Sequence, residues 1–461
     1  MDMAMDYPKR ILIVGNGGRE NAIGNALLLS EQLEGLWITP ANWGLVDHHS
    51  TGRVHTLDVK ATDLAGIVNA AREIPADLVV VGPEDPLCAG LADMLREAGI
   101  PTVGPGADAA QLEGSKRFAK QFMQRHGIPT AGFAEFTELD ELLAYISAGK
   151  GPLVLKADGL AAGKGVIVAA NREEAADAAR VLLEEKRFGD AGRTVLAEEC
   201  LLGREISFTV LISGGRAEVL PPSSDYKRLQ DDDRGPNTGG MGNICPTPWA
   251  TDEVIVEFSR DILAPFMRGL RADGLDYRGF LFVGTMITES GLKVIEFNTR
   301  FGDPEAEVVI PLCSADWPLL LAHMAAGELP QDALELREGA CVAVVLASGN
   351  YPYGKSEPAA ISGIERLQGQ GLLELRRDGD AVLPPQVSLH FAGVSREGDP
   401  GVYENHFSKS DNSAFLASGG RVLALSAMGA DLSAARRLAY EAVGNLHFEG
   451  MQFRSDIGKL R

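Results

Sequence analysis

The sequence has little positive charge and no long apolar run. Its 461 residues include 43 Lys and Arg against 64 Asp and Glu, a formal net charge of −21. Excess negative charge repels a polyanion, so we expect no nucleic-acid partner. The apolar run Ile11–Val14 is too short to cross a bilayer and follows a short polar segment, so we expect no signal peptide and no membrane partner.

Paired cysteines and metal-binding histidine patterns are also missing. The chain has five scattered cysteines without a CxxC pair, namely Cys88, Cys200, Cys245, Cys313 and Cys341. An odd, unpaired set in a large chain predicts reduced structural thiols and a cytoplasmic protein. The eight histidines show neither HxxxH nor HxxE spacing, so a zinc site has little support.

What is present describes a large globular protein. Hydrophobic residues make up 45% of the chain and charged residues 23%, which is typical of folded proteins and not of disordered ones. A chain of this length is too long for one ordinary core, so several domains are expected.

The amino-terminal part alternates short apolar runs with helical segments. The apolar runs predict strands at Ile11–Val14, Leu36–Thr39, Leu78–Val81 and Thr102–Val103. Helices are expected near Glu20–Leu33 and Pro86–Ala98. This alternation is typical of a parallel, doubly wound sheet.

The rest of the chain has a mixed α+β pattern. Ser115 is suited to cap a helix that ends near His126, with Gly127 after it. Further strands are expected at 153–155, 166–169, 194–198, 204–212, 217–220, 279–288, 292–298, 341–346 and 421–426, and further helices at 172–185, 252–271 and after Asp431.

Residues 155–168 form the most informative motif. Lys156 and Lys164 flank a loop of glycine and alanine between two apolar strands. Small side chains let backbone N–H groups approach an anion, so this cationic loop is suited to cover a polyphosphate. A Walker motif ends in Gly-Lys-Ser/Thr and begins a helix, whereas here Gly165 follows Lys164 and Val166 begins a strand, which excludes a P-loop. A solvated hairpin with incidental lysines is the alternative.

The second motif runs from Val294 to Glu305. In a strand, Glu296 and Asn298 project to the same face. A carboxylate beside an amide carbonyl offers hard oxygen ligands, suited to Mg²⁺ that nucleotide phosphates already carry. Arg300 and Asp303 follow in a loop that could hold a substrate. An edge strand with surface polar residues is the alternative.

The third motif is Gly235-Pro-Asn-Thr-Gly-Gly-Met-Gly242, which has four glycines in eight residues. Such a loop brings several backbone donors close to a ligand. Asp225-Tyr-Lys-Arg228 precedes it and adds positive charge. A disordered surface loop is the alternative.

Together and in this order, the three motifs resemble those of the phosphoribosylamine–glycine ligases, the glycinamide ribonucleotide synthetases of purine biosynthesis, which are ATP-grasp enzymes. The matching stretches cover most of residues 11–310. They also include Gly15-Asn-Gly-Gly-Arg-Glu20, Val81-Gly-Pro-Glu84, Gln111-Leu-Glu-Gly-Ser-Lys116 and Phe188-Gly-Asp-Ala-Gly192. The carboxyl-terminal third matches more thinly, through Gly419-Gly-Arg-Val-Leu423 and Asp456-Ile-Gly458.

The resemblance implies an α/β and α+β multidomain protein with an ATP-grasp fold. Residues 1–114 would form an N-terminal doubly wound parallel-sheet domain that binds substrate. Residues 115–206 would form the first ATP-grasp half with a small lid subdomain, and 207–335 the second half with the metal site. Residues 336–461 would form a C-terminal α/β domain.

The resemblance also implies roles for individual residues. ATP would be bound by Lys120, Lys156, Lys164, Glu198, Glu199, Leu201 and Glu205. Mg²⁺, or Mn²⁺, would be coordinated by Glu296 and Asn298. Substrates would be bound by Gly15, Gly17, Gly18, Arg19, Glu20, Glu84, Asp225, Lys227, Asn237 and Arg300, with Gly15–Glu20 and Glu84 facing phosphoribosylamine. The catalytic residues would be Lys156, Arg300 and Asp303.

The reaction that the resemblance implies is ligation of glycine to 5-phosphoribosylamine, with ATP cleaved to ADP and phosphate. A carboxylate is a poor acyl donor because its leaving group would be oxide, so glycyl phosphate would form first. Water must be kept from this intermediate, and closure of the 157–165 loop is expected to do so. The partners would be these two small molecules, and the protein would be a monomer or a weak homo-oligomer.

The chain departs from the family pattern near the amino terminus. Asn21 stands where the family has His, and Trp43 stands where it has Ala. Tyr226 replaces another His, and Thr299 a Cys. Trp43 must either pack away from the ligand or narrow its pocket, while Asn21 can still donate and accept hydrogen bonds. We therefore predict altered affinity for the acceptor amine within an unchanged substrate class.

Three other functions are alternatives for this sequence. A dehydrogenase would use Gly15-x-Gly17, but Glu20 stands at the third glycine position and no acid follows the next strand at Thr39-Pro40. A regulatory nucleotide-binding module would have lost phosphate and metal residues, yet Lys156 and Glu296 are present. An ATP-grasp ligase that acts on a different amine stays open.

Overall fold

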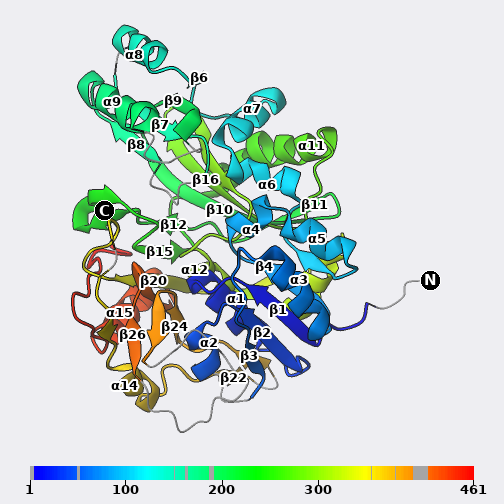
Figure 1. Cartoon of the computed structure of the whole chain (residues 1–461). Coiled ribbons are helices and arrows are strands. Elements are labelled where there is room, and N and C mark those ends of the chain that lie inside the picture. Colours follow the sequence, from blue (N-terminus) through cyan, green and yellow to red (C-terminus); the bar gives the residue numbers. More distant parts are fainter. Residues whose placement is uncertain are drawn as a thin grey trace.

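The computed structural model describes residues 5–48, 52–149, 151–160, 165–185, 192–354, 356–378, 381–397 and 414–460. Four larger sheets organise these residues, one parallel and three antiparallel (Figure 1). The parallel sheet predicted for the amino-terminal part of the chain is confirmed.

The amino-terminal sheet has the strand order β3-β2-β1-β4-β5, and all its strands are parallel. The strands are β1 (Arg10–Val14), β2 (Gly35–Thr39), β3 (Val54–Thr56), β4 (Leu78–Val81) and β5 (Thr102–Val103). The helices are α1 (Gly18–Leu27), α2 (Trp43–His48), α3 (Leu64–Glu73), α4 (Glu84–Cys88), α5 (Leu91–Glu97) and α6 (Ala107–Gly114). Gly15 and Glu84 follow the carboxyl ends of adjacent strands, where parallel sheets bind ligands.

Some predicted bounds in this sheet are wrong. The helix expected over 20–33 ends at Leu27, and β3 and α3 were not predicted. The helix expected over 86–98 is two helices, because Gly90 has φ +89° and breaks it.

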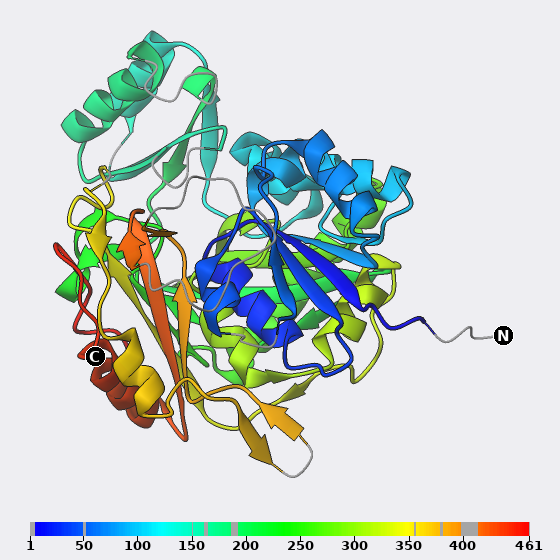
Figure 2. The same ribbon diagram turned by 60° about the horizontal axis from the view of Figure 1, so that its bottom comes forward.

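A small antiparallel sheet of order β6-β9-β7-β8 projects from the rest of the molecule (Figures 1 and 2). Its strands are β6 (Phe133–Phe136), β7 (Leu153–Ala157), β8 (Val166–Ala169) and β9 (Val195–Glu199). Its helices are α8 (Leu139–Ala148), α9 (Arg172–Ala179) and the π-helical turn Arg180–Glu184. The preceding helix α7 (Lys116–His126) is capped by Ser115 and ends at Gly127 with φ +69°, as predicted.

The central sheet has the order β11-β10-β16-β17. Its strands are β10 (Arg204–Ser213), β11 (Arg216–Val219), β16 (Gly279–Thr288) and β17 (Gly291–Asn298). The helix predicted over 252–271 covers it as α10 (Asp252–Glu257), the π-helical turn Phe258–Leu263 and α11 (Ala264–Ala272). Phe208 stacks on Phe258 with ring centroids 3.8 Å apart, which anchors this helix on the sheet.

The last large sheet has the order β12-β15-β20-β27-β24 and is antiparallel. Its strands are β12 (Ser224–Asp225), β15 (Gly242–Cys245), β20 (Ala340–Ala347), β24 (Val387–Phe391) and β27 (Arg421–Gly429), covered by α15 (Leu432–Val443). Two of its strands thus come from the polar stretch 221–248 and three from the carboxyl-terminal third. The domain bounds given above stay a prediction.

Shorter elements complete the described chain. The strands are β13 (Arg228–Gln230), β14 (Arg234–Asn237), β18 (Cys313–Ser314), β19 (Glu335–Leu336), β21 (Ala359–Ala360), β22 (Arg376–Asp378), β23 (Ala381–Leu383), β25 (Val394–Arg396) and β26 (Phe415–Ala417). The helices are α12 (Ala306–Val309), α13 (Trp317–Ala325), α14 (Ile364–Gly369) and the 3-10 turns Asp231–Asp233 and Ile310–Leu312. Within these residues, no helix combines the length and the apolar character needed to cross a lipid bilayer.

The amino-terminal and carboxyl-terminal sheets lie side by side (Figure 2). Helix α1 contacts both α12 and β24. This contact places the first glycine-rich turn beside residues that are hundreds of positions away in the chain.

Candidate active site

A cavity of about 1100 Å³ lies where the sheets meet. The predicted site residues that line it are Gly15, Gly17, Arg19, Glu20, Glu84, Lys120, Lys156, Glu198, Glu199, Leu201, Glu205, Asp225, Lys227, Asn237, Glu296, Asn298, Arg300 and Asp303. Lys164 and residues 188–191 lie outside the described residues. Gly18 is not part of the lining: a Cβ there would lie 2.4 Å from Glu307, so its small size serves the packing of α1.

Two buried lysines share one carboxylate where the small sheet β6-β9-β7-β8 borders the cavity. Glu198 on β9 accepts from Lys120 at 2.8 Å and from Lys156 at 3.0 Å. Burial lowers the pKa of Lys120 to about 8, although Glu198 opposes that shift. The other oxygen of Glu198 has no hydrogen-bond partner among the residues that the structure describes. Two ammonium groups against one carboxylate leave net positive charge, which is suited to phosphates.

A bulge in β17 helps to hold Lys156. The pairing with β16 shifts so that Glu296 faces Gly284 and Val294 faces Thr285, which leaves Ile295 without a ladder partner. The carbonyl of Ile295 accepts a hydrogen bond from Lys156 at 3.3 Å. Lys156 thereby joins the small sheet β6-β9-β7-β8 to the central sheet.

The start of the lysine-flanked loop is anchored to the beginning of α7. The carboxylate of Asp158 accepts from the Ser115 hydroxyl at 2.8 Å and from the Arg117 N–H at 2.7 Å. The ammonium of Lys116, a lining residue that the sequence analysis did not identify, donates to the carbonyl of Gly159 at 3.0 Å.

Glu296 and Asn298 lie on the cavity side of β17, as their spacing predicts. Lys227 forms ion pairs with Glu205 and, at 3.9 Å, with Glu296. Burial alone would raise the pKa of Glu296, but Lys227 and then Lys156 outweigh it and lower that pKa. The carboxylate is therefore ionised and available to a cation.

The donor set fits a metal ion that arrives with a ligand. No group of three or more His, Cys, Asp or Glu side chains suited to a metal occurs in the described part of the chain. One carboxylate and one amide oxygen, from Glu296 and Asn298, are the few protein ligands that Mg²⁺ takes when phosphates supply others.

Arg300 connects the central sheet to the amino-terminal domain. Its guanidinium pairs with Glu84 at 3.4 Å and with Glu113 at 2.9 Å. Burial raises the pKa of Glu113 to about 7, partly offset by Arg300. Glu113 also accepts from the N–H of Thr299 at 2.7 Å. Sequence reasoning gave Glu113 no role, although it lies in the matching stretch Gln111–Lys116.

Glu20 is held inside the first glycine-rich turn. Its carboxylate accepts from the Gly17 N–H at 2.6 Å and pairs with Arg19. A Cβ at Gly82 would lie 1.9 Å from this carboxylate, and one at Gly15 would lie 2.8 Å from it. Glu20 therefore occupies the turn and uses a donor that a dinucleotide would need, which argues against a dehydrogenase.

Arg421 is a second site residue that the sequence analysis did not identify. It pairs with the Asp303 carboxylate at 3.0 Å and donates to the Asp303 carbonyl at 2.7 Å. Burial would raise the pKa of Asp303, but Arg421 and then Arg19 lower it. By contrast, burial and the charge of Glu305 raise the pKa of Asp225. The signal for Arg421 was its place in the matching stretch Gly419–Leu423.

The loop 235–242 uses part of its backbone within the protein. The Gly239 N–H donates to the Tyr351 hydroxyl at 2.8 Å, and the Gly240 N–H donates to Thr238 at 3.1 Å. These two donors are thus engaged, although Asn237, Thr238 and Gly239 line the cavity.

The two departures near the amino terminus both lie in packed surroundings. Trp43 is 3% exposed and packs in the core of the carboxyl-terminal domain, away from the cavity lining. Asn21 is buried and donates to Asn42 at 2.7 Å. Trp43 therefore packs away from the cavity and does not narrow it.

Known proteins with a similar sequence span the whole chain. Profiles of the family described as phosphoribosylglycinamide synthetase match residues 9–113 (N domain), 114–306 (ATP-grasp (A) domain) and 341–460 (C domain). The phosphoribosylamine–glycine ligase of Allochromatium vinosum is 41% identical over 97% of this chain and 98% of its own. That of Vibrio cholerae is 39% identical over 97% of both chains.

Solved structures agree with these sequence matches and with the predicted ATP-grasp fold. The phosphoribosylamine–glycine ligase of Thermotoga maritima superposes with a TM-score of 0.76 at 32% identity, covering 97% of this chain and 99% of that one. The biotin carboxylase domain of Hydrogenobacter thermophilus 2-oxoglutarate carboxylase shares the fold alone, with a TM-score of 0.67 at 17% identity over 97% and 92% of the two chains. The chain therefore belongs to the phosphoribosylglycinamide synthetase family.

Proposed function

We propose that this chain ligates glycine to 5-phosphoribosylamine in purine biosynthesis, giving glycinamide ribonucleotide, ADP and phosphate through glycyl phosphate. The relatives named above are phosphoribosylamine–glycine ligases, which supports the choice of substrates. The observation that carries the proposal in the structure is Arg300, which lies two residues beyond Asn298 and pairs with Glu84. It joins the predicted metal side and the predicted acceptor side in one cavity.

ATP is assigned to the side of the cavity that the small sheet β6-β9-β7-β8 borders. Lys120 and Lys156 carry the net positive charge that the phosphates need, with Lys164 as a third predicted contact. The segment 198–201 takes adenine through backbone groups, and Glu205 takes the ribose. These assignments follow the family pattern, and the burial of both lysines supports them because buried charge interacts strongly with phosphate.

Glu296 and Asn298 are the residues that would hold Mg²⁺ or Mn²⁺. The ion, when bound, neutralises charge on the phosphates during transfer. Lys227 adds a fixed positive charge beside the same carboxylate. Together with Lys156, these groups orient the terminal phosphate toward the carboxylate of glycine.

Arg300 and Asp303 are assigned to the acyl-transfer step. The guanidinium of Arg300 faces charge that develops on the acyl phosphate, while Glu84 and Glu113 fix its orientation. Asp303 is held ionised by Arg421 and Arg19 next to the turn 15–20, where phosphoribosylamine is assigned. The attacking amine and the acyl phosphate thus meet between the two loops.

The test is ADP release with ATP, glycine and freshly generated phosphoribosylamine, each omitted in turn. We expect turnover only when all three are present. With ¹⁸O in the glycine carboxylate, the released phosphate should carry label, because the carboxylate oxygen leaves with the phosphoryl group. AMP and pyrophosphate as products would refute the acyl-phosphate route.

The same assay separates the alternatives. Brisk turnover with another amine and none with phosphoribosylamine would favour a ligase with a different acceptor. ATP binding without any turnover would favour a regulatory module. A cytoplasmic location and a monomer or weak homo-oligomer are further parts of this proposal, tested by fractionation and by light scattering.

A further inference from the structure

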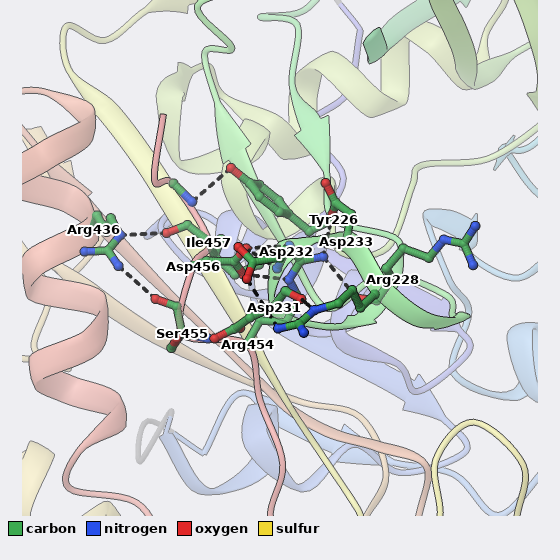
Figure 3. A network of polar contacts seen from close by, with 12 residues as sticks. Tyr226, Arg228, Asp231, Asp232, Asp233, Arg436, Arg454, Ser455, Asp456 and Ile457 are labelled. Atoms are coloured by element: carbon green, nitrogen blue, oxygen red, sulfur yellow. Dashed lines mark hydrogen bonds and ion pairs between the residues drawn. The ribbon is translucent and has the colours of Figure 1, made fainter. Parts of the chain in front are cut away.

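Arg454 is fully buried although it lies near the end of the chain. Its side chain is 1% exposed and donates two hydrogen bonds of 2.8 Å to Asp456. It also donates to Asp233 at 2.8 Å and to the carbonyl of Arg228 at 3.1 Å. Its guanidinium lies over the ring of Tyr226, 5.0 Å from the centroid (Figure 3). One side chain thus contacts two separate segments.

Tyr226 and Arg228, which Arg454 contacts, are the residues immediately before and after Lys227. Lys227 is the residue whose ammonium lies between Glu205 and Glu296. Arg454 and Asp456 line the cavity themselves. Arg454 also holds the chain on both sides of Lys227, a lining cation with which it forms no hydrogen bond.

The loop next to Lys227 needs support from outside. Asp232 and Asp233 have φ of 62° and 52°, a region that side chains other than Gly rarely adopt. The N–H of Asp232 donates to Asp456 at 3.0 Å, and the N–H of Ser455 donates to Asp231 at 2.8 Å. The carboxyl-terminal segment thus stabilises a strained turn.

The segment is in turn tied to α15. Arg436 donates to the carbonyls of Ser455 at 2.8 Å and Ile457 at 2.9 Å. The Tyr440 hydroxyl donates to the carbonyl of Arg454 at 2.7 Å. Figure 3 shows Arg436 on the helix at one side of the network and the loop with Tyr226 and Arg228 at the other.

We propose that Arg454 is a positioning residue for the nucleotide site: by fixing Tyr226 and Arg228 it keeps Lys227 between Glu205 and Glu296. The proposal rests on the proposed function only in identifying ATP as the nucleotide. It gives residues 454–457 a part in binding Mg–ATP.

The geometry requires arginine. A planar guanidinium can bond bidentately to Asp456, reach the carbonyl of Arg228 and stack on Tyr226 at once, while a lysine ammonium is a point charge without the fork. Asp233 contributes less, because its side chain is 68% exposed and exposed ion pairs are weak.

The experiment compares Arg454→Met with Arg337→Met. Arg337 is also an arginine beyond residue 335 that donates to backbone carbonyls, at 3.0 Å to Pro311 and 2.7 Å to Cys313, and it does not line the cavity. The dissociation constant of Mg–ATP is measured by calorimetry, KM and kcat by ADP release, and stability by thermal unfolding.

We expect Arg454→Met to raise the Mg–ATP dissociation constant and KM roughly tenfold, with a smaller effect on kcat. Arg337→Met should lower the unfolding midpoint and leave the dissociation constant within about twofold. The dissociation constant of Arg454→Lys should lie between those of the wild type and Arg454→Met. If Arg454→Met does not fold, Arg454→Lys replaces it in the comparison.

Two outcomes would overturn the proposal. Equal changes in the dissociation constant for the Arg454 and Arg337 variants would mean general destabilisation. A larger change in Lys459→Met, or wild-type affinity of Arg454→Lys, would mean that lining cations of this segment bind nucleotide directly through their charge. If the wild type binds Mg–ATP but releases no ADP with glycine and phosphoribosylamine, the proposed function fails, while the binding comparison still decides the role of Arg454.

Discussion

Asn21 donates a hydrogen bond of 2.7 Å to the side-chain oxygen of Asn42, and both residues are at most 2% exposed. The amide of Asn42 in turn donates to the carbonyls of Asn16 at 2.9 Å, Gly17 at 3.2 Å and Phe391 at 2.8 Å. One buried amide thus joins α1, the first glycine-rich turn and the carboxyl-terminal sheet. The asparagine that replaces the family histidine keeps that amide in place.

Asn42→Ala should weaken binding of phosphoribosylamine more than binding of ATP. It removes this donor from the carbonyls of Asn16 and Phe391, whereas that of Gly17 still accepts from the Asn21 N–H at 3.1 Å, and an unsatisfied buried group costs about 1–3 kcal/mol. We expect a higher KM for phosphoribosylamine, a nearly unchanged KM for ATP and a lower unfolding midpoint. Asn25→Ala, at the outer end of the same chain of amides, is the matched control. Equal rises in both KM values would contradict this role.

Trp43→Ala should destabilise the protein without changing acceptor affinity. Trp43 lies in the core of the carboxyl-terminal domain and not on the cavity, so its removal leaves a cavity in that core. Loss of a buried tryptophan costs about 3–5 kcal/mol. Urea unfolding measures that loss, and KM for phosphoribosylamine is measured where the variant is folded. A changed KM with unchanged stability would show that Trp43 faces the ligand after all.

Trp43 also shows why part of the site could not be predicted from the sequence. Local patterns predicted strands such as Gly279–Thr288 and the Ser115 cap, because hydrophobic runs and caps act over a few residues. The side on which Trp43 packs depends on β24 and on other residues of the carboxyl-terminal sheet, far away in the chain. Only the folded structure brings these partners together.

The same limit applies to the charged residues of the site. The lysine loop and the Glu296 strand were found because each is a local motif. Arg421 and Arg454 act on residues more than a hundred positions away, Asp303 and Arg228. One short match to the family contains Arg421 and another, Asp456–Gly458, lies just after Arg454, but a match alone does not identify the partner on which an arginine acts.

Lys156→Met should reduce turnover at least tenfold. It keeps the length of the side chain but removes a charge assigned to the phosphates, and a charge-assisted contact is worth about 1.5–3 kcal/mol. Lys293→Met is the matched control, since Lys293 pairs with Glu199 nearby and does not line the cavity. Normal turnover of a folded Lys156→Met protein, measured by ADP release, would remove Lys156 from the site.

The double variant Glu296→Gln, Asn298→Ala should abolish Mg²⁺-dependent turnover while the fold persists. Glu296→Gln removes the carboxylate charge, and Asn298→Ala removes the amide oxygen. Lys227 also loses one acidic partner. Glu289→Gln, an exposed change on the turn of the same hairpin, is the control. ADP release is titrated with Mg²⁺ and with Mn²⁺. An unchanged metal dependence in the double variant would place the ligands elsewhere.

Binding of ATP should take up protons at moderately alkaline pH, and Lys120 is the group responsible. Burial lowers the pKa of Lys120 to about 8 in the free protein, against an ordinary value near 10.5, with Glu198 opposing and Lys156 reinforcing the shift. Bound phosphates favour the ammonium form, so the pKa rises on binding. The affinity for ATP is therefore greatest below a pH of about 8 and falls as the pH rises through that value.

Calorimetry at about pH 8.5, in two buffers of different protonation enthalpy, measures this uptake because the apparent heat then depends on the buffer. We expect uptake of a fraction of a proton per ATP in the wild type. Lys120→Met should lose most of it, and Lys293→Met should keep it, since Lys293 lies outside the cavity lining. ATP itself is fully ionised at this pH. Uptake that persists in Lys120→Met would therefore assign the titrating group to another lysine of the cavity, with half-buried Lys116 the next candidate, because desolvation lowers its pKa as well.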